Sequence, residues 1–135
     1  MLENNAAQTE RKNPFFEPYN TPHDTVPFNR IEIGDYEEAF LEGIRRDDEE
    51  IEKLVNDPET PTFENTIVRV DNENGENYYD LLSRVSTVFS CMLSAEPCDE
   101  LDALAQKMRP ILTKHANFVK LNKRLFERIK YVYEN

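Results

Sequence analysis

The feature that most constrains this chain is the spacing of its apolar residues, which return every three or four positions along most of the sequence. This spacing matches the turn of an α-helix and gathers the apolar side chains on one side of it. Asp35 followed by Glu38 has the spacing of a capping box and predicts the start of the first helix. Pro58 and Pro61 predict its end near residue 56. Its apolar stripe comprises Tyr36, Phe40, Ile44, Ile51, Leu54 and Val55.

The second and third helices are predicted on either side of an asparagine-rich stretch. Thr62 is a good N-cap for the second helix, with Phe63, Ile67 and Val70 on its apolar side. Residues 72–77 read N-E-N-G-E-N and predict a turn or loop. The third helix is expected over residues 78–95. It has the broadest apolar face, so we expect it to be the most buried element.

Two more stripes predict the rest of the fold. A fourth helix is expected from near Asp99, with a kink at Pro110, and a fifth from Asn122. Short connections favour antiparallel packing of neighbouring helices. We therefore predict an all-α fold, with about five amphipathic helices in an antiparallel bundle over residues 35–135. The fifth stripe reaches Asn135 without a glycine cap, so we expect the chain to be part of a longer protein.

The segment before the helices divides into a tail and an arm. Residues 1–12 have nothing to bury and are expected to be a disordered tail. Residues 13–34 carry four prolines, which block a helix and predict an extended arm across the helical body. The aromatic pairs Phe15-Phe16 and Tyr78-Tyr79 are interpreted as packing anchors rather than as a ligand cage.

Charge is strong and unevenly distributed. The formal net charge of -11 argues against nucleic acid as the main partner. Residues 1–106 hold 8 basic and 25 acidic side chains, whereas residues 107–135 hold 8 basic and 2 acidic ones. The basic part could bind an acidic partner, but we favour the interpretation that the last helices lie against the acidic earlier ones.

The sequence contains no candidate membrane segment. No stretch approaches the roughly 18 apolar residues of a membrane span, and no signal peptide is visible. These observations favour a cytoplasmic location, with a periplasmic one as the alternative if a leader has been removed.

No residue pattern predicts a catalytic, cofactor-binding or metal site in this chain. His23 and His115 are the only histidines, and neither belongs to an H-E-x-x-H motif. Cys91 and Cys98 do not form a C-x-x-C motif. We interpret His115 as a satisfied core histidine and Cys91 as a buried, inert thiol. Asp47–Glu50 is interpreted as a solvated helix face rather than as a catalytic pair.

Several strings resemble a known family. They are N-P-F-F-E-P-Y-N-T-P-H (Asn13–His23), T-V-P-F-N-R-I (Thr25–Ile31), P-T-F-E-N-T-I-V (Pro61–Val68), L-S-A-E (Leu93–Glu96) and L-N-K-R-L-F-E-R-I-K-Y-V-Y-E (Leu121–Glu134). In order and spacing they resemble the amino-terminal region of bacterial peptidyl-dipeptidases, of the thimet oligopeptidase family of zinc metallopeptidases. The region around residues 72–79 is about five residues longer than the family pattern. A loop insertion of this size costs little free energy of folding.

The resemblance implies a parent enzyme that hydrolyses short peptides with zinc-activated water and releases carboxy-terminal dipeptides. The metal ligands of that family lie far downstream, so none is assigned here and the chain alone is expected to be inactive. Its helices would form part of the substrate-channel wall, with the rest of the peptidase and its oligopeptide substrates as partners. The isolated piece is expected to self-associate, mainly through the fifth helix. The alternative is a free-standing acidic helical module for protein interaction.

Overall fold

The computed structural model describes residues 10–71 and 81–135. It confirms the all-α fold, with five helices and no strand among these residues. The helices are α1 (Ile33–Val55), α2 (Arg69–Asp71), α3 (Leu81–Ala95), α4 (Asp99–Lys120) and α5 (Lys123–Glu134). The predicted loop over 72–77, the pair Tyr78-Tyr79 and residues 1–9 of the predicted tail lie outside the described residues.

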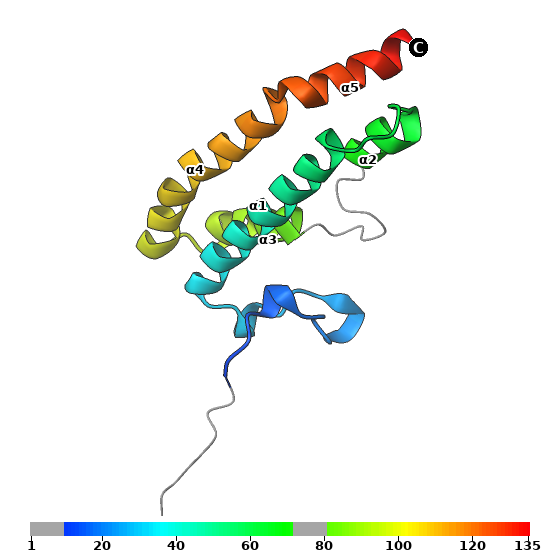
Figure 1. Cartoon of the computed structure of the whole chain (residues 1–135). Helices are drawn as coiled ribbons and strands as arrows, with labels where there is room; N and C mark the ends of the chain where they lie inside the picture. Colours follow the sequence, from blue (N-terminus) through cyan, green and yellow to red (C-terminus); the bar gives the residue numbers. More distant parts are fainter. Residues whose placement is uncertain (1–9, 72–80) are drawn as a thin grey trace, which may run out of the picture.

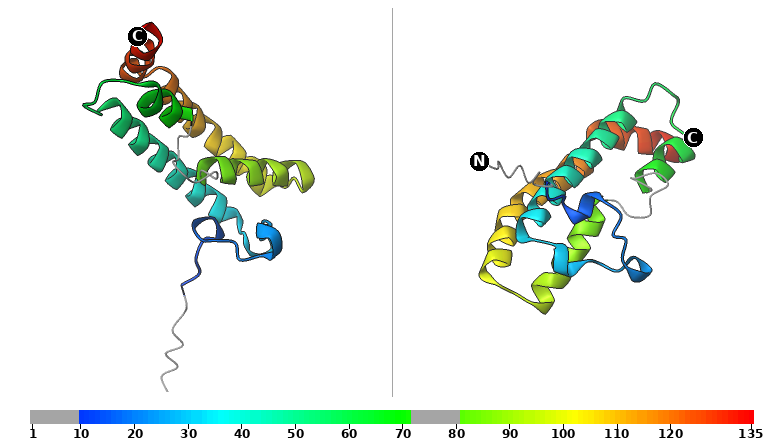
Figure 2. Two further views of the ribbon diagram at one scale, coloured as in Figure 1. Left: turned by 90° about the vertical axis from the view of Figure 1, so that its right-hand side faces the viewer. Right: turned by 90° about the horizontal axis from the view of Figure 1, so that it is seen from below.

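The helices are arranged around α1. This helix packs against α3, α4 and α5. Figures 1 and 2 show that α4 runs alongside α1 in the same direction, and that α5 continues away from the end of α4. The bundle is therefore centred on α1, which contacts each of the other three long helices. The expectation that the third helix is the most buried is wrong, because α1 has nine buried residues and α3 has four.

The start of α1 differs from the prediction. The N-cap is Glu32, and Asp35 occupies the third helical position instead of the cap. The backbone N–H of Glu32 donates to Asp35 Oδ2 at 2.7 Å, which satisfies a donor that the first turn leaves without a helical partner. This bond brings Ile33 and Gly34 into the helix. The end of α1 agrees with the prediction, since Asn56 is its C-cap.

The arm before α1 contains three short 3-10 turns, η1 (Pro14–Phe16), η2 (Pro22–Asp24) and η3 (Phe28–Arg30). Asn13 caps η1, because its side-chain oxygen accepts from the backbone N–H of Phe15 at 3.0 Å. The Phe15 side chain is completely buried, which confirms it as a packing anchor, whereas Phe16 is partly exposed.

The main core lies where the arm, α1, α3 and α4 meet. Four aromatic rings form a chain through it, with centroid distances of 5.6 Å for Phe15–Tyr36, 5.2 Å for Tyr36–Phe89 and 5.3 Å for Phe40–Phe89. Edge-to-face and tilted contacts of this kind stabilise beyond their buried area. Its buried residues are Phe15, Tyr36, Ala39, Phe40, Leu81, Val85, Val88, Phe89, Leu101, Leu104 and Met108.

A second, smaller core lies between the carboxy-terminal half of α1 and α5. It buries only four residues, Ile51, Leu54, Val55 and Leu125. The fourth and fifth helices begin where the sequence predicts, after Cys98 and after the N-cap Asn122. Pro110 lies inside α4, which continues through it. None of the described helices is both long and apolar enough to cross a lipid bilayer.

The second predicted helix takes an unexpected form. Thr62 is its N-cap, as predicted, and accepts from the N–H of Asn65 at 3.1 Å. However, the segment η4 (Phe63–Val68) is π-helical and only α2, which follows directly, is α-helical. The wider π turn changes which residues face inward. Thr66 is fully buried and Phe63 is 57% exposed, so the prediction that Phe63 lies on the packed side is wrong.

Candidate functional site

His115 of α4 lies between two carboxylates of α1. Its Nδ1 is 2.7 Å from Asp48 Oδ1 and its Nε2 is 3.6 Å from Asp47 Oδ2. The imidazole is 11% exposed, which confirms the prediction of a satisfied and largely buried histidine. Asp47 is itself buried, so the interpretation of Asp47–Glu50 as a solvated face is wrong at this position. The reason is its place one helical turn before the buried Ile51, on the packed side of α1.

The other residues considered for chemistry are not brought together. His23 is exposed on η2, and Cys91 and Cys98 are exposed free thiols. The prediction that Cys91 is buried is wrong, because α3 turns Val88 and Phe89 inward and the thiol lies off that face. In the described ranges, no group of three or more His, Cys, Asp or Glu side chains could hold a metal ion. The residues present therefore do not fit the zinc site that the resemblance implies for a parent enzyme.

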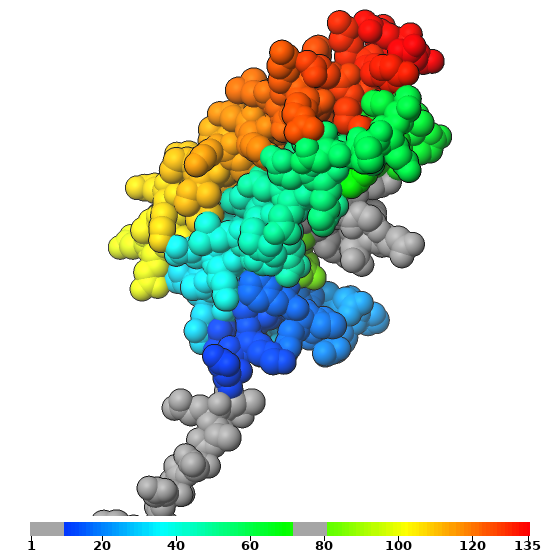
Figure 3. Space-filling view, in the orientation of Figure 1, coloured from blue at the N-terminus to red at the C-terminus, as the bar shows by residue number. Residues whose placement is uncertain are grey.

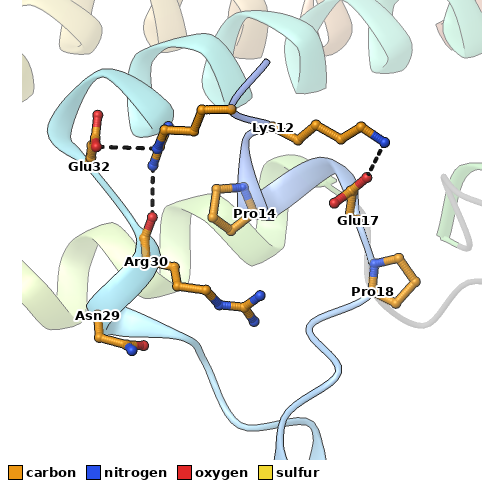
Figure 4. A pocket seen from close by; sticks show the side chains of 8 residues that line it. Lys12, Pro14, Glu17, Pro18, Asn29, Arg30 and Glu32 are labelled. Atoms are coloured by element: carbon orange, nitrogen blue, oxygen red, sulfur yellow. Dashed lines mark hydrogen bonds and ion pairs between the residues drawn. The ribbon is translucent and has the colours of Figure 1, made fainter. Parts of the chain in front are cut away.

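A cavity of about 350 Å³ opens between the arm and the start of α1 (Figure 4). Its charged side chains already have partners within the chain. Arg11 Nε lies 3.2 Å from Glu32 Oε1, and Lys12 Nζ lies 2.9 Å from Glu17 Oε1. Arg11 Nη2 also donates to the carbonyl oxygen of Arg30 at 2.7 Å. The contact of Arg11 with Glu32 joins the arm to the N-cap of α1, and the other two contacts lie within the arm. We call this group of contacts the arm clamp.

The most buried part of this clamp is the pair Arg11–Asp35. The guanidinium donates to both carboxylate oxygens of Asp35, at 2.8 and 2.6 Å. The Asp35 side chain is 5% exposed, whereas that of Arg11 is 44% exposed. The hydrogen bonds from Arg11 hold the pKa of the Asp35 carboxyl below its ordinary value, and its burial opposes them only in part. Arg11 and Lys12 thus belong with the arm, although the sequence suggested a tail up to residue 12.

A second arginine fixes the opposite end of the molecule. Arg128 of α5 is 8% exposed and reaches the segment that carries the string P-T-F-E-N-T-I-V. It donates to the carbonyl oxygens of Asp57 at 3.0 Å and Glu59 at 3.4 Å. It also donates to Asn65 Oδ1 and Thr66 Oγ1, both at 3.4 Å. Its hydrogen-bond acceptors here are neutral, so Arg128 holds α5 and η4 together by directed hydrogen bonds.

Arg128 is not among the residues for which a role is predicted from the sequence, although a signal is present there. The residue falls among Leu125, Ile129 and Val132 on the apolar stripe of α5. A lone cation on the packed side of a helix is seldom buried without acceptors. That pattern predicts a buried hydrogen-bonding role for Arg128, but it does not reveal which segment supplies the acceptors.

Large apolar side chains remain exposed at this same end of the molecule. Figure 3 shows α5 next to the segment of η4 and α2 there. We call the exposed apolar side chains of this region the α5–η4 surface. Its members are Phe63, Val68, Leu121, Phe126, Tyr131 and Tyr133. Tyr133 is 90% exposed and Phe126 is 62% exposed, so these side chains are not covered by the described chain.

Comparison with known proteins gives the context for these features. No protein-family model matches the chain. It is 35% identical over 122 residues to a dipeptidyl carboxypeptidase of Salmonella typhimurium, and 34% identical over 122 residues to one of Escherichia coli. Each match covers 90% of this chain but only 17% of the relative. The chain is therefore homologous to the amino-terminal part of the bacterial dipeptidyl carboxypeptidases.

Proposed function

We propose that this chain forms the amino-terminal, non-catalytic part of a zinc-dependent peptidyl-dipeptidase. Such an enzyme hydrolyses short peptides and releases dipeptides from the carboxyl end. The single observation that carries the proposal is the 35% identity over 90% of the chain to a protein named dipeptidyl carboxypeptidase. The peptidase activity belongs to the longer protein, because the chain spans only 17% of that relative.

In this proposal the zinc ligands lie outside the chain. The two histidines are on different segments, and His115 is engaged with carboxylates of α1. A catalytic zinc site needs three protein ligands at fixed geometry, which the described residues do not provide. In this proposal the contribution of the chain is structural.

We further propose that the helices line one wall of the channel that admits the peptide substrate. The support is the shape of the structure, in which the long helices α1 and α4 lie side by side on a shared core (Figure 1). Packed helices of this length form a stiff surface. A stiff wall can exclude folded proteins from a narrow channel while extended peptides enter.

The test is a chimera in which the matching part of this chain replaces the corresponding segment of the Escherichia coli relative. We expect the chimera to release dipeptides from a short peptide and to lose this activity when zinc is chelated. The isolated chain, assayed with added zinc, is expected to show no turnover. Turnover by the isolated chain, or a chimera that folds but releases no dipeptides, would contradict the proposal.

A second candidate function is a free-standing acidic module that binds a partner protein. The observation that favours it is the α5–η4 surface, because exposed apolar side chains on an amphipathic helix are typical of helix-mediated binding. It predicts that the isolated chain captures a specific partner, and that the chimera is inactive.

A further inference from the structure

The exposed apolar side chains are concentrated at one end of the molecule. Nine large apolar side chains are exposed among the described residues, and six of them lie on η4, on α5 or at Leu121 between α4 and α5, the residues named above as the α5–η4 surface. The other three, Phe16, Phe28 and Leu41, are distributed over η1, η3 and α1. Single exposed apolar residues are ordinary, whereas a group on adjoining elements is typical of an interface.

The pattern along α5 shows that this helix has two apolar sides. Leu125 and Arg128 are buried and Ile129 packs against the smaller core, so this side faces α1 and η4. Phe126 and Tyr133 are seven residues apart, which places them nearly in line on another side of the helix. A surface helix normally has one apolar stripe, and apolar residues on a second side indicate packing from two directions.

The α5–η4 surface is held in place rather than loosely attached. Arg128 joins α5 to the carbonyl oxygens of residues 57 and 59, and Arg124 Nη2 donates to the carbonyl oxygen of Val55 at 3.0 Å. Both arginines therefore fix α5 against the end of α1 and the segment after it. A surface ordered before binding loses less conformational entropy when a partner covers it.

We propose that the α5–η4 surface is the interface on which the remainder of the longer peptidase packs. This inference rests on the proposed function. The length of the relatives supports this choice of partner for the surface. The match covers 17% of the Salmonella typhimurium protein, so most of that protein lies outside it. A second argument is the small size of the core beneath this surface. Among the described residues it buries four, whereas the main core buries eleven. An apolar face of the remainder would complete that core from the outside.

The experiment places Phe126→Glu and Tyr133→Glu together in two proteins, the isolated 135-residue chain and the Escherichia coli chimera. Glutamate is a good helix former, so the change removes apolar surface without breaking α5. The matched control is Phe28→Glu, which changes an aromatic side chain that is 49% exposed outside the surface. The readouts are the thermal unfolding midpoint of both proteins and the rate of dipeptide release by the chimera.

We expect the double variant to leave the unfolding midpoint of the isolated chain unchanged. In the chimera it should lower the midpoint and reduce dipeptide release roughly tenfold or more, because a displaced wall misplaces the substrate. The Phe28→Glu chimera should behave like the parent chimera.

Three results would overturn the inference. An active parent chimera whose double variant matches the Phe28→Glu control would leave the proposed function standing and refute this interface. A parent chimera that folds but releases no dipeptides would refute the proposed function, and the inference with it. A stable micromolar dimer of the chimera that the double variant makes monomeric, with dipeptide release unchanged, would assign the surface to a second copy.

Discussion

The two ends of the molecule bury apolar surface to very different degrees. At the arm end, η1, α1, α3 and α4 enclose eleven residues around a chain of aromatic rings. At the α5 end, four residues are buried and six large apolar side chains are exposed. Since apolar burial is the dominant favourable term in folding, the described residues stabilise the arm end more fully than the α5 end. The difference is the basis of the proposal that the rest of a longer peptidase packs on the α5 end.

The two ends also use arginine differently. At the arm end, Arg11 is paired with the buried carboxylate of Asp35. At the α5 end, Arg128 donates to backbone carbonyls and to side chains that do not titrate. The first contact depends on pH and the second does not. Variants at the two ends can therefore separate the contributions of apolar packing, directed hydrogen bonding and charge to the free energy of unfolding.

The largest expected effect is the loss of a ring from the main core. Phe40 is 1% exposed, and Phe40→Ala should lower the free energy of unfolding by about 3–5 kcal/mol through lost burial and a residual cavity. The matched variant is Phe126→Ala, which should change it by less than about 0.5 kcal/mol in the isolated chain. Urea unfolding followed by circular dichroism measures both, and equal losses would contradict the comparison.

Removal of the Arg128 guanidinium should have the next largest effect. In Arg128→Met the chain keeps a long side chain but loses the hydrogen bonds to the buried Thr66 and to three acceptors outside the core, so the free energy of unfolding should fall by about 1–3 kcal/mol. Lys130→Met, on an exposed residue of the same helix, is the control and should be close to neutral. If the control is as destabilising as Arg128→Met, the hydrogen bonds of Arg128 do not stabilise the α5 end.

A smaller effect is expected where α1 and α3 approach most closely. A Cβ atom at Gly43 would lie 3.0 Å from the backbone of Leu82. In Gly43→Ala the helix-propensity gain of up to about 1 kcal/mol should be outweighed by strain of about 1–3 kcal/mol. Gly34→Ala meets no atom within 4 Å and should be neutral or stabilising. A Gly43→Ala chain more stable than the parent would show that α3 can move away at no cost.

The smallest expected effect is the pH dependence at the arm end. The pKa of Asp35 is lowered in the folded state, so its stabilising contribution is present above the ordinary aspartate pKa of about 3.9. That contribution is lost as the pH falls through the lower folded value. Asp35→Asn should reduce the loss of stability with acid, whereas Arg128→Met should leave the acid dependence unchanged. Urea midpoints measured across the acid range test both statements, and an unaltered acid profile in Asp35→Asn would contradict the first.

The helical class and most helix boundaries could be predicted because they follow from local pattern. The apolar period, the caps Thr62 and Asn122, and the proline stop after α1 depend only on neighbouring residues. The errors concern which side chains are buried, where tertiary contacts or the type of helix determine the burial. Phe63 is exposed because η4 is π-helical, and Asp47 is buried because α4 covers it with His115.

The candidate interface could be predicted only in part. The apolar residues of α5 are visible in the sequence, which predicts self-association of the isolated chain through the fifth helix. Which of its sides is covered depends on where α1 and η4 lie, because Leu125 and Phe126 are equally apolar neighbours in the sequence. The acceptors of Arg128 are more than sixty residues distant in the sequence, so these hydrogen bonds could not be derived from local pattern.

Amide hydrogen exchange in the isolated chain, followed by NMR, tests the central claim most directly. Amides that pack on the main core in α1, α3 and α4 should exchange only by global unfolding and be the slowest in the chain. Those of η4 and α5 should exchange faster, through local opening of the smaller core. If the amides of α5 are protected as strongly as those around Phe40 and Phe89, the α5 end is complete by itself and the account is wrong.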